Sequence, residues 1–356
     1  MSLNKILVLL MAAVFLFTSC YAKVVVFQEA PVTESVKQEA KVDPGIKTDS
    51  DKKPLVHSGE LLTGLSFSAN TTSSTDGNAQ ADGVMVAVSV DTDGIIRDCI
   101  IDSVQAKVPF DDKGIIQADI NVPVESKNEL GPRYGMAKAS GIGKEWNEQM
   151  EALSRYVVGK TAAEVQGISF KDGKPEDVDL ASSVTVYMGG FLSQIVEAVE
   201  NAQYRGASVG DKLEMVSYTT LSSSKNAEGD VAGNAQADIN VMVLTLSGDR
   251  ITSAYTDSIQ AKVPFDSRGK LVGSLSEDVA SKNELKENYG MGAYSSIGAD
   301  WYKQAESYSA YITGKTIDEV LGVAVNEKFA PADTDLSSSV TMSIGSFNNM
   351  LKKVSL

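Results

Sequence analysis

The sequence predicts an α+β protein with two tandem homologous domains, each an antiparallel sheet with helices, after a disordered N-terminal tether. Three observations predict this. One set of motifs is present twice at nearly constant spacing, and in each copy alternating apolar residues precede apolar residues at helical spacing. The segment before the first copy has neither pattern. Strands that come before helices, rather than alternating with them, are typical of the α+β class.

The composition limits the class of partner. The chain has 356 residues, enough for two ordinary domains, and its 32 basic and 47 acidic residues give a formal net charge of −15. Binding to nucleic acid requires an excess of Lys and Arg, so the charge argues against a nucleic acid partner. His57 is the single histidine, and the predicted domains therefore contain no Ser-His-Asp or Cys-His set.

Residues 1–20 are predicted to be a lipoprotein signal peptide. Lys5 precedes the apolar run ILVLLMAAVFLF, which is short for a membrane span. The run ends in FTSC, and this resembles a bacterial lipobox in which Cys20 is lipidated, although Phe17 stands where the motif usually has Leu. The alternative is ordinary secretion with cleavage after Ala22. Both alternatives place the protein outside the cytoplasm.

Residues 21–55 are predicted to form a flexible tether. The segment is rich in Lys, Glu, Asp, Val and Pro, and no aromatic residue lies between Phe27 and Phe67. Such a composition buries too little apolar surface to offset the entropy of ordering. Beyond the tether, Cys99 is the one remaining cysteine, so no internal disulfide is expected. Its strand-like context, IIRDCIID, favours a buried thiol without a chemical role.

The remainder of the chain is an internal duplication. The motif DSVQAKVPFD starts at Asp102 and DSIQAKVPFD at Asp257, so the spacing is 257 − 102 = 155 residues. SKNELGPRYGM at Ser126 and SKNELKENYGM at Ser281 have the same spacing. A nearly constant offset over a whole repeat is the signature of tandem domains. We predict domain 1 over residues 56–205 and domain 2 over residues 206–356, with the boundary near Arg205.

Each copy is predicted to begin with strands. In the first copy VMVAVSV alternates, DTDG makes a turn, and IIRDCIID follows. A helix comes next, because apolar residues are spaced by four, three and four in both copies: Trp146, Met150, Leu153 and Val157, and Trp301, Ala305, Tyr308 and Ile312. Gly159 and Gly314 are expected to end these helices. Capping boxes of Thr161 with Glu164, and of Thr316 with Glu319, predict a short second helix.

A hydroxyl-rich segment closes each copy: DLASSVTVYMGGF at 179–191 and DLSSSVTMSIGSF at 335–347. Apolar residues at helical spacing run through both segments from the valine before the threonine. We therefore expect a helix there, with Thr185 and Thr341 in its first turn, where N–H groups and the helix dipole favour a phosphate. The expected N-cap positions are those of Ser182, Ser183, Ser338 and Ser339.

A purely structural role is the alternative for this segment. Ser, Thr and Asp before an apolar helix are the commonest capping signal. Two facts favour more than a cap: the unit D-L-x-S-S-V-T is longer than a cap requires, and both copies retain it together with Gly189 and Gly345. Duplication alone preserves some identity, so both alternatives stay open at this point.

These residues carry a resemblance. D-L-x-S-S-V-T resembles the S-G-A-T flavinylation motif of FMN-binding domains, with Ser183 and Val184 in place of Gly and Ala, and likewise Ser339 and Val340. The wider pattern, SKNELGPRYGM…SGIGKEWNEQ…VVGKT…EVQGI…DLASSVT, is similar to the flavinylated lipoproteins of Gram-positive extracellular electron transfer, the PplA type. The resemblance covers roughly residues 56–356, and the lipobox and the tether agree with it.

The resemblance implies a cofactor and its site. Thr185 and Thr341 would each carry one FMN through a phosphoester bond made by a flavin transferase. The transferase would recognise Asp179 and Asp335. The motif YGM could flank the flavin ring through Tyr134 and Met136, and through Tyr289 and Met291, although a tight turn explains its glycine equally. For Trp146 and Trp301 the apolar helix stripe favours core packing over contact with the cofactor.

The resemblance implies a redox carrier or reductase component rather than a classical enzyme. The protein would relay electrons from a membrane NADH-quinone oxidoreductase system to extracellular acceptors such as ferric iron or soluble flavins. It would be lipid-anchored at the outer face of the cell membrane. The alternative function is a non-catalytic surface binding lipoprotein that holds a ligand or a cell-wall component. A third possibility is a signalling peptide released from the leader.

Overall fold

The computed structural model describes residues 59–354, which belong to one compact unit. The predicted signal peptide, the tether, the lipidation site Cys20 and His57 lie outside the described residues. None of the helices between residues 59 and 354 has the length and apolar character needed to cross a membrane.

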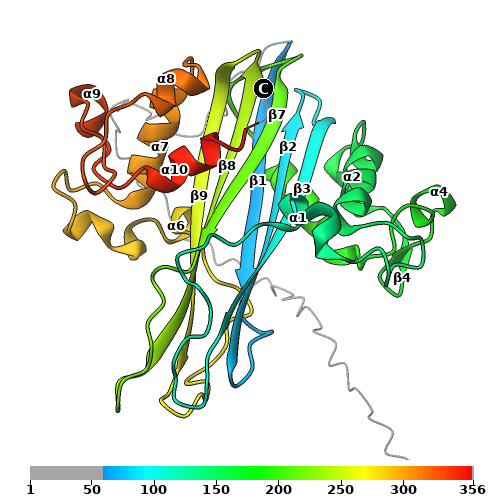
Figure 1. Cartoon of the computed structure of the whole chain (residues 1–356). Helices are drawn as coiled ribbons and strands as arrows, with labels where there is room; N and C mark the ends of the chain where they lie inside the picture. Colours follow the sequence, from blue (N-terminus) through cyan, green and yellow to red (C-terminus); the bar gives the residue numbers. More distant parts are fainter. Residues whose placement is uncertain (1–58, 355–356) are drawn as a thin grey trace, which may run out of the picture. The chain divides into compact units, whose positions relative to one another are not determined.

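Two antiparallel sheets form the centre of the unit (Figure 1). The first sheet has the strand order β3-β2-β1-β6, and the second has the order β7-β8-β9. The predicted strands VMVAVSV and IIRDCIID pair as neighbours, with Val88 opposite Cys99. The strands are β1 Glu60–Asn70, β2 Asn78–Val90, β3 Ile96–Pro109, β6 Gln203–Ser208, β7 Lys212–Thr220, β8 Gly233–Ser247 and β9 Arg250–Phe265.

The helices of each repeat cover the outer face of that repeat's own sheet (Figure 1). The first repeat contributes α1 Lys127–Leu130, η1 Gly131–Tyr134, α2 Trp146–Val157, α3 Ala162–Gln166, α4 Val178–Ala181 and α5 Gly189–Glu200, with the short strands β4 Phe170–Lys171 and β5 Lys174–Pro175. The second contributes α6 Lys282–Leu285, η2 Lys286–Tyr289, η3 Met291–Ala293, α7 Trp301–Ile312, α8 Ile317–Leu321, α9 Thr334–Ser337 and α10 Gly345–Leu351. The antiparallel sheets with their helices confirm the α+β class.

The first long helix of each repeat has the predicted bounds. Helix α2 begins at Trp146 and α7 at Trp301, and the apolar residues spaced by four, three and four are buried in both. Gly159 and Gly314 follow these helices with φ of 84° and 86°, a conformation that favours glycine. Both predicted capping boxes, at Thr161 and at Thr316, are present. Local sequence signals therefore determined this part of the fold.

The two sheets pack face to face and share one core. Side chains from β1, β2 and β3 and from β7, β8 and β9 form a single cluster between the sheets. Many of them are alanines, including both alanines of each GNAQAD motif: Ala79, Ala81, Ala235 and Ala237. Small side chains let the two sheets approach closely, and this gives the duplicated motif a structural role.

Reciprocal contacts join the repeats at one end of the sandwich. The rings of Phe110 and Phe265 stack with their centroids 4.0 Å apart and their planes at 8°. A Cβ added at Gly114 would lie 2.7 Å from the Asp266 carbonyl oxygen, and one added at Gly269 would lie 2.5 Å from that of Asp111. Both glycines also have positive φ, so each turn requires glycine for two reasons.

The residues near the predicted domain boundary form a strand of the first sheet. Arg205 lies in β6, which pairs with β1 through Tyr204 opposite Leu62. Gly206 approaches the second sheet so closely that a Cβ there would lie 2.4 Å from the Thr252 carbonyl oxygen. The connection between the repeats is thus part of the sandwich and does not act as a free linker.

Candidate functional site

The two predicted acceptor threonines lie in loops between helices. Thr185 is in the loop from α4 to α5, and Thr341 is in the loop from α9 to α10. The prediction of a helix that starts at the valine before each threonine is wrong, because α5 begins at Gly189 and α10 at Gly345. Neither threonine lies in a first helical turn. The expected stabilisation of a phosphate by the helix dipole therefore loses its basis.

The serines before the threonines close one helix instead of opening another. Ser182 and Ser338 are the C-caps of α4 and α9, and the N-caps of these helices are Asp177 and Asp333. The Ser182 hydroxyl donates to the Asp179 carbonyl at 2.7 Å. Their predicted N-cap role is therefore wrong, for Ser183 and Ser339 as well, since α5 and α10 begin after Met188 and Ile344.

In each repeat a buried glutamine accepts hydrogen bonds from the threonine loop, which at this point of the described chain has no helical hydrogen bonds. The Gln149 Oε1 atom accepts the backbone N–H of Thr185 at 2.8 Å, that of Val186 at 3.2 Å, and the Thr185 hydroxyl at 3.2 Å. The Gln149 amide donates to Ser140 Oγ and to the Lys144 carbonyl. Gln149 comes from α2 and has 0% exposure, so its amide fixes the loop to the helix without contact with solvent.

The second repeat has the same arrangement. Gln304 Oε1 accepts the N–H groups of Thr341 and Met342 at 2.8 and 3.0 Å and the Thr341 hydroxyl at 3.3 Å. Ser295, the counterpart of Ser140, receives the Gln304 amide and lies 3.4 Å from the Thr341 hydroxyl. We did not predict either glutamine. The signal was a glutamine three residues after the tryptophan, on the buried stripe of the same helix in both copies.

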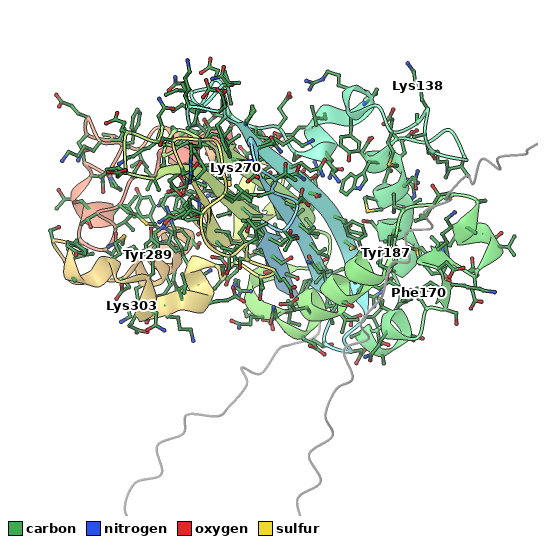
Figure 2. The ribbon with its side chains drawn as sticks, turned by 90° about the horizontal axis from the view of Figure 1, so that it is seen from below. Lys138, Phe170, Tyr187, Lys270, Tyr289 and Lys303 are labelled. Carbon is green, nitrogen blue, oxygen red and sulfur yellow. The ribbon has the colours of Figure 1, made fainter. Side chains whose placement is uncertain are left out.

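Exposed aromatic rings lie beside both threonine loops. In the first repeat Tyr187 is 69% exposed, and its ring occupies the space in which a side chain at Gly173 would lie, 2.0 Å from that Cβ. Figure 2 shows Tyr187 next to Phe170, and both rings lie within 3.4 Å of a Cβ added at Gly189.

The second repeat also has an aromatic ring beside its threonine loop, but a different position in the sequence provides it. Ser343 stands at the position of Tyr187, and Phe329 stands at the position of Gly173. Phe329 is 59% exposed, has φ of 58°, and contacts a Cβ added at Gly345 at 3.4 Å. The ring therefore comes from the opposite side of the loop but packs beside the equivalent glycine.

Lysines cover the tyrosines of the YGM motifs. Lys127 Nζ lies 5.0 Å from the centroid of Tyr134 and 5.0 Å from that of Trp146. Lys282 lies 4.9 Å from Tyr289 and 5.0 Å from Trp301. Burial lowers the pKa of Lys282 to about 8. The tryptophans are 3% and 6% exposed, which confirms their assignment to the core.

Among residues 59–354 no hydrogen bond joins a residue of the YGM motifs to either threonine. The Tyr134 and Tyr289 hydroxyls donate to Gln105 and Gln260 on the strands, at 3.4 and 3.2 Å. Met136 and Met291 begin the turns that lead to Ser140 and Ser295, whose N–H groups donate to the methionine carbonyls. These turns place the serines next to the glutamines. Contact between the YGM side chains and a flavin stays a prediction.

Two further acidic groups support the short helices α1 and α6, whose N-caps are Ser126 and Ser281. Asp102 accepts the N–H groups of Ser103 and Asn128 at 2.7 and 3.1 Å, and Asp257 has the equivalent bonds. Burial raises the pKa of each carboxyl to about 6, although these hydrogen bonds oppose the shift. By contrast, Asp179 and Asp335 are exposed, and their carboxylates are accessible to a partner.

Among the described residues, the first repeat has a charge partner that would suit an esterified phosphate near its threonine, and the second repeat does not. Both threonines are partly exposed. In the first repeat Lys144 Nζ donates to Ser183 Oγ at 3.0 Å, which places a positive charge at the residue two positions before Thr185. Ala299 takes the place of Lys144 in the second repeat, so the two sites differ in charge. The exposed rings at Tyr187 and Phe329 offer an aromatic face to a planar group in both.

Comparison with known proteins gives little further information. No protein family matches the sequence, and no solved structure matches it. A chlorophenol reductase of Desulfitobacterium hafniense is 52% identical over 42 residues, which are 12% of this chain and 13% of that protein. The chain thus matches a small fraction of this relative's length, and the match does not assign a family.

Proposed function

We propose that this protein is an extracellular electron carrier with one FMN attached covalently to Thr185 and one to Thr341. The observation that carries the proposal is that the two threonines have the same structural surroundings. Each is partly exposed in a loop, each is fixed by a buried glutamine, and each has an exposed aromatic ring nearby.

The chain's own residues would hold and orient the cofactor. FMN supplies the electron-transfer chemistry when bound, and the protein supplies attachment and electrostatics. Gln149 and Gln304 fix the loop backbone, and each also accepts the threonine hydroxyl, which FMN attachment would free from this hydrogen bond. The exposed Asp179 and Asp335 would be recognised by the flavin transferase. Lys144 would offset phosphate charge in the first repeat.

The location and the partners belong to the same proposal. Lipidation at Cys20 and the tether of residues 21–55 would hold the folded unit near the outer face of the cell membrane. There it would receive electrons from a membrane NADH-quinone oxidoreductase system and pass them to ferric iron or soluble flavins. The negative net charge agrees with a role that does not involve nucleic acid.

Intact mass spectrometry tests the proposal directly. Protein produced together with a competent flavin transferase should carry two FMN adducts, and flavin absorbance should survive denaturation and precipitation. Thr185→Ala and Thr341→Ala should each remove one adduct. A colourless protein of unmodified mass, made with a transferase that modifies a control substrate, would refute the electron-carrier function and favour a non-catalytic binding lipoprotein.

A further inference from the structure

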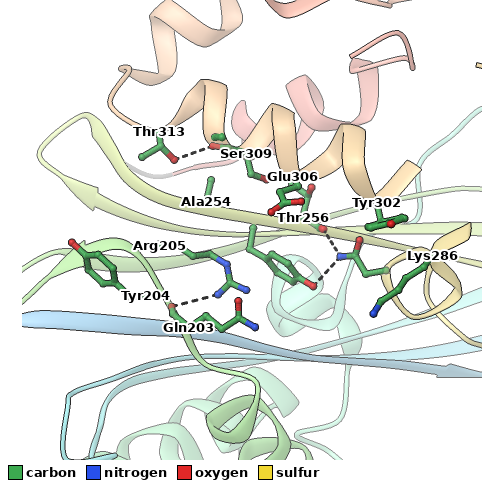
Figure 3. Close-up of a pocket in the computed structure, with 13 residues that line it drawn as sticks. Gln203, Tyr204, Arg205, Ala254, Thr256, Lys286, Tyr302, Glu306, Ser309 and Thr313 are labelled. Carbon is green, nitrogen blue, oxygen red and sulfur yellow. Dashed lines mark hydrogen bonds between the residues drawn. The ribbon is translucent and has the colours of Figure 1, made fainter. Parts of the chain in front are cut away.

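A cavity of about 570 Å³ lies where the two repeats meet, and no residue of either threonine loop lines it (Figure 3). Strand β6 forms one wall, and β9 with α7 forms the other. A second hollow of about 470 Å³ shares Arg205, Tyr255 and Lys286 with it, so the two form one continuous groove. Cavities of this size at such junctions are typical of small-molecule sites.

Arg205 is the central charged group of the cavity. Its guanidinium lies 4.4 Å from the centroid of the Tyr255 ring, and its Nη1 donates to the backbone carbonyls of Thr63 and Gln203 at 2.6 and 3.5 Å. In the described part of the chain it has no carboxylate within ion-pair distance, although Glu306 is near enough to favour its charged form. In the same part of the chain its Nε and Nη2 donate to no acceptor. A partly buried guanidinium with free donors is suited to a carboxylate.

Lys286 at the rim has an unfavourable backbone conformation. Its φ is 49° and its ψ is −122°, and the equivalent residue of the first repeat is Gly131 with φ of 48°. A residue with a side chain is strained at positive φ, whereas glycine adopts this conformation without strain. The second repeat, in which this position borders the groove, has lysine where the first repeat has glycine. Such strain is characteristic of functional positions.

The walls also differ from their counterparts in the first repeat. Tyr255, Thr256 and Tyr302 line the cavity, whereas the equivalent hollow of about 270 Å³ has Ile100, Ile101 and Asn147 at these positions. Tyr255 and Thr256 thus stand where the first repeat has the apolar Ile100 and Ile101, and Tyr302 stands where it has the polar Asn147. Two buried hydroxyls of the wall, Thr256 Oγ1 and Ser309 Oγ, have no partner among the described residues.

An acidic residue of the cavity, Glu306, lacks the arginine that its counterpart in the first repeat has. In the first repeat Glu151 forms an ion pair with Arg155. In the second repeat Glu306 is the counterpart of Glu151, and Ala310 stands at the position of Arg155. Glu306 therefore has no basic partner within ion-pair distance in the described part of the chain, and it lines the same cavity as Arg205.

We propose that this cavity binds a small carboxylic acid that carries an adjacent amino or hydroxyl group, the chemistry shared by α-amino and α-hydroxy acids. The carboxylate would bind Arg205 and Lys286, and the neighbouring donor would bind Glu306. The tyrosine rings would contact the remainder of the molecule. The site involves no residue of the threonine loops, so binding does not depend on the flavin.

Calorimetric titration of the unmodified full chain tests the proposal, with L-phenylalanine, 3-phenyllactate and inorganic phosphate as probes. At least one of the two acids should bind, and phosphate should not. Arg205→Gln should weaken binding about tenfold to a hundredfold, as expected for loss of charge-assisted hydrogen bonds. Glu306→Gln should weaken the amino acid more than the hydroxy acid. Arg155→Gln, on the opposite flank, is the matched control and should change nothing.

Lys286→Gly separates binding from folding. This variant restores the residue of the first repeat and removes strain, so it should be at least as stable as the wild type while binding more weakly. The proposal would be overturned if neither acid binds, or if phosphate binds more tightly than both acids. It would also be overturned if the wild type, Arg205→Gln and Lys286→Gly bind the acids with equal affinity.

Discussion

The buried glutamine beside each threonine gives the sharpest prediction. Gln149→Leu keeps a similar volume but removes the acceptor for the N–H groups of Thr185 and Val186, and the donor to Ser140 and the Lys144 carbonyl. Loss of a partner costs about 1–3 kcal/mol for each buried polar group. Thr185 and Val186 are partly exposed, so water compensates in part and the lower end applies.

We therefore expect the free energy of unfolding to fall by about 2–3 kcal/mol, after allowance for the apolar burial of leucine. The folded state should survive, because domains have stabilities of about 5–15 kcal/mol. Urea unfolding measures the global effect, and hydrogen exchange measures the local one. The amides of Thr185 and Val186 should exchange about tenfold to a hundredfold faster. With the transferase, the Thr185 adduct should decrease while the Thr341 adduct remains.

Gln304→Leu is the matched control for this experiment. It should accelerate exchange at Thr341 and Met342 and leave Thr185 and Val186 unchanged. Unchanged exchange at Thr185 and Val186 in Gln149→Leu would refute the conclusion that the glutamine fixes the loop. A normal Thr185 adduct together with faster exchange would show that the fixed loop is not needed for modification.

Three further predictions concern burial and strain. Burial raises the Asp102 pKa from 3.8 to about 6. Between these two pH values the carboxyl therefore stays protonated in the native state and is ionised in the unfolded chain. The contribution of this carboxyl to stability should fall as pH rises from about 4 to about 6, by on the order of 3 kcal/mol. The urea stability of Asp102→Asn relative to the wild type should therefore rise over the same pH range. Cys99 is 4% exposed, and burial raises its thiol pKa to about 12, so a thiol reagent should label it at neutral pH only after urea is added. Phe329→Gly should raise the unfolding free energy by about 1 kcal/mol through relief of positive φ, and a lower urea midpoint would instead assign the ring a stabilising contact.

The sequence alone determined the elements that rest on local signals. The stripe from Trp146 to Val157 and the capping box at Thr161 each involve residues a few positions apart, so their hydrogen bonds and buried faces can be read from spacing. The duplication also identified Thr185 and Thr341 as equivalent positions, although it could not determine their conformation.

Only the tertiary structure decided how those elements meet. Thr185 has helical spacing to its apolar neighbours, yet Gln149, 36 residues earlier in the chain, provides its N–H partner and removes the need for a helix there. The shared core and the Arg205 cavity depend on contacts between the repeats, which no spacing within one repeat contains. The physical reason is range: caps and stripes satisfy groups within a few residues, whereas a buried amide or a junction cavity depends on which distant chain segment supplies its partner.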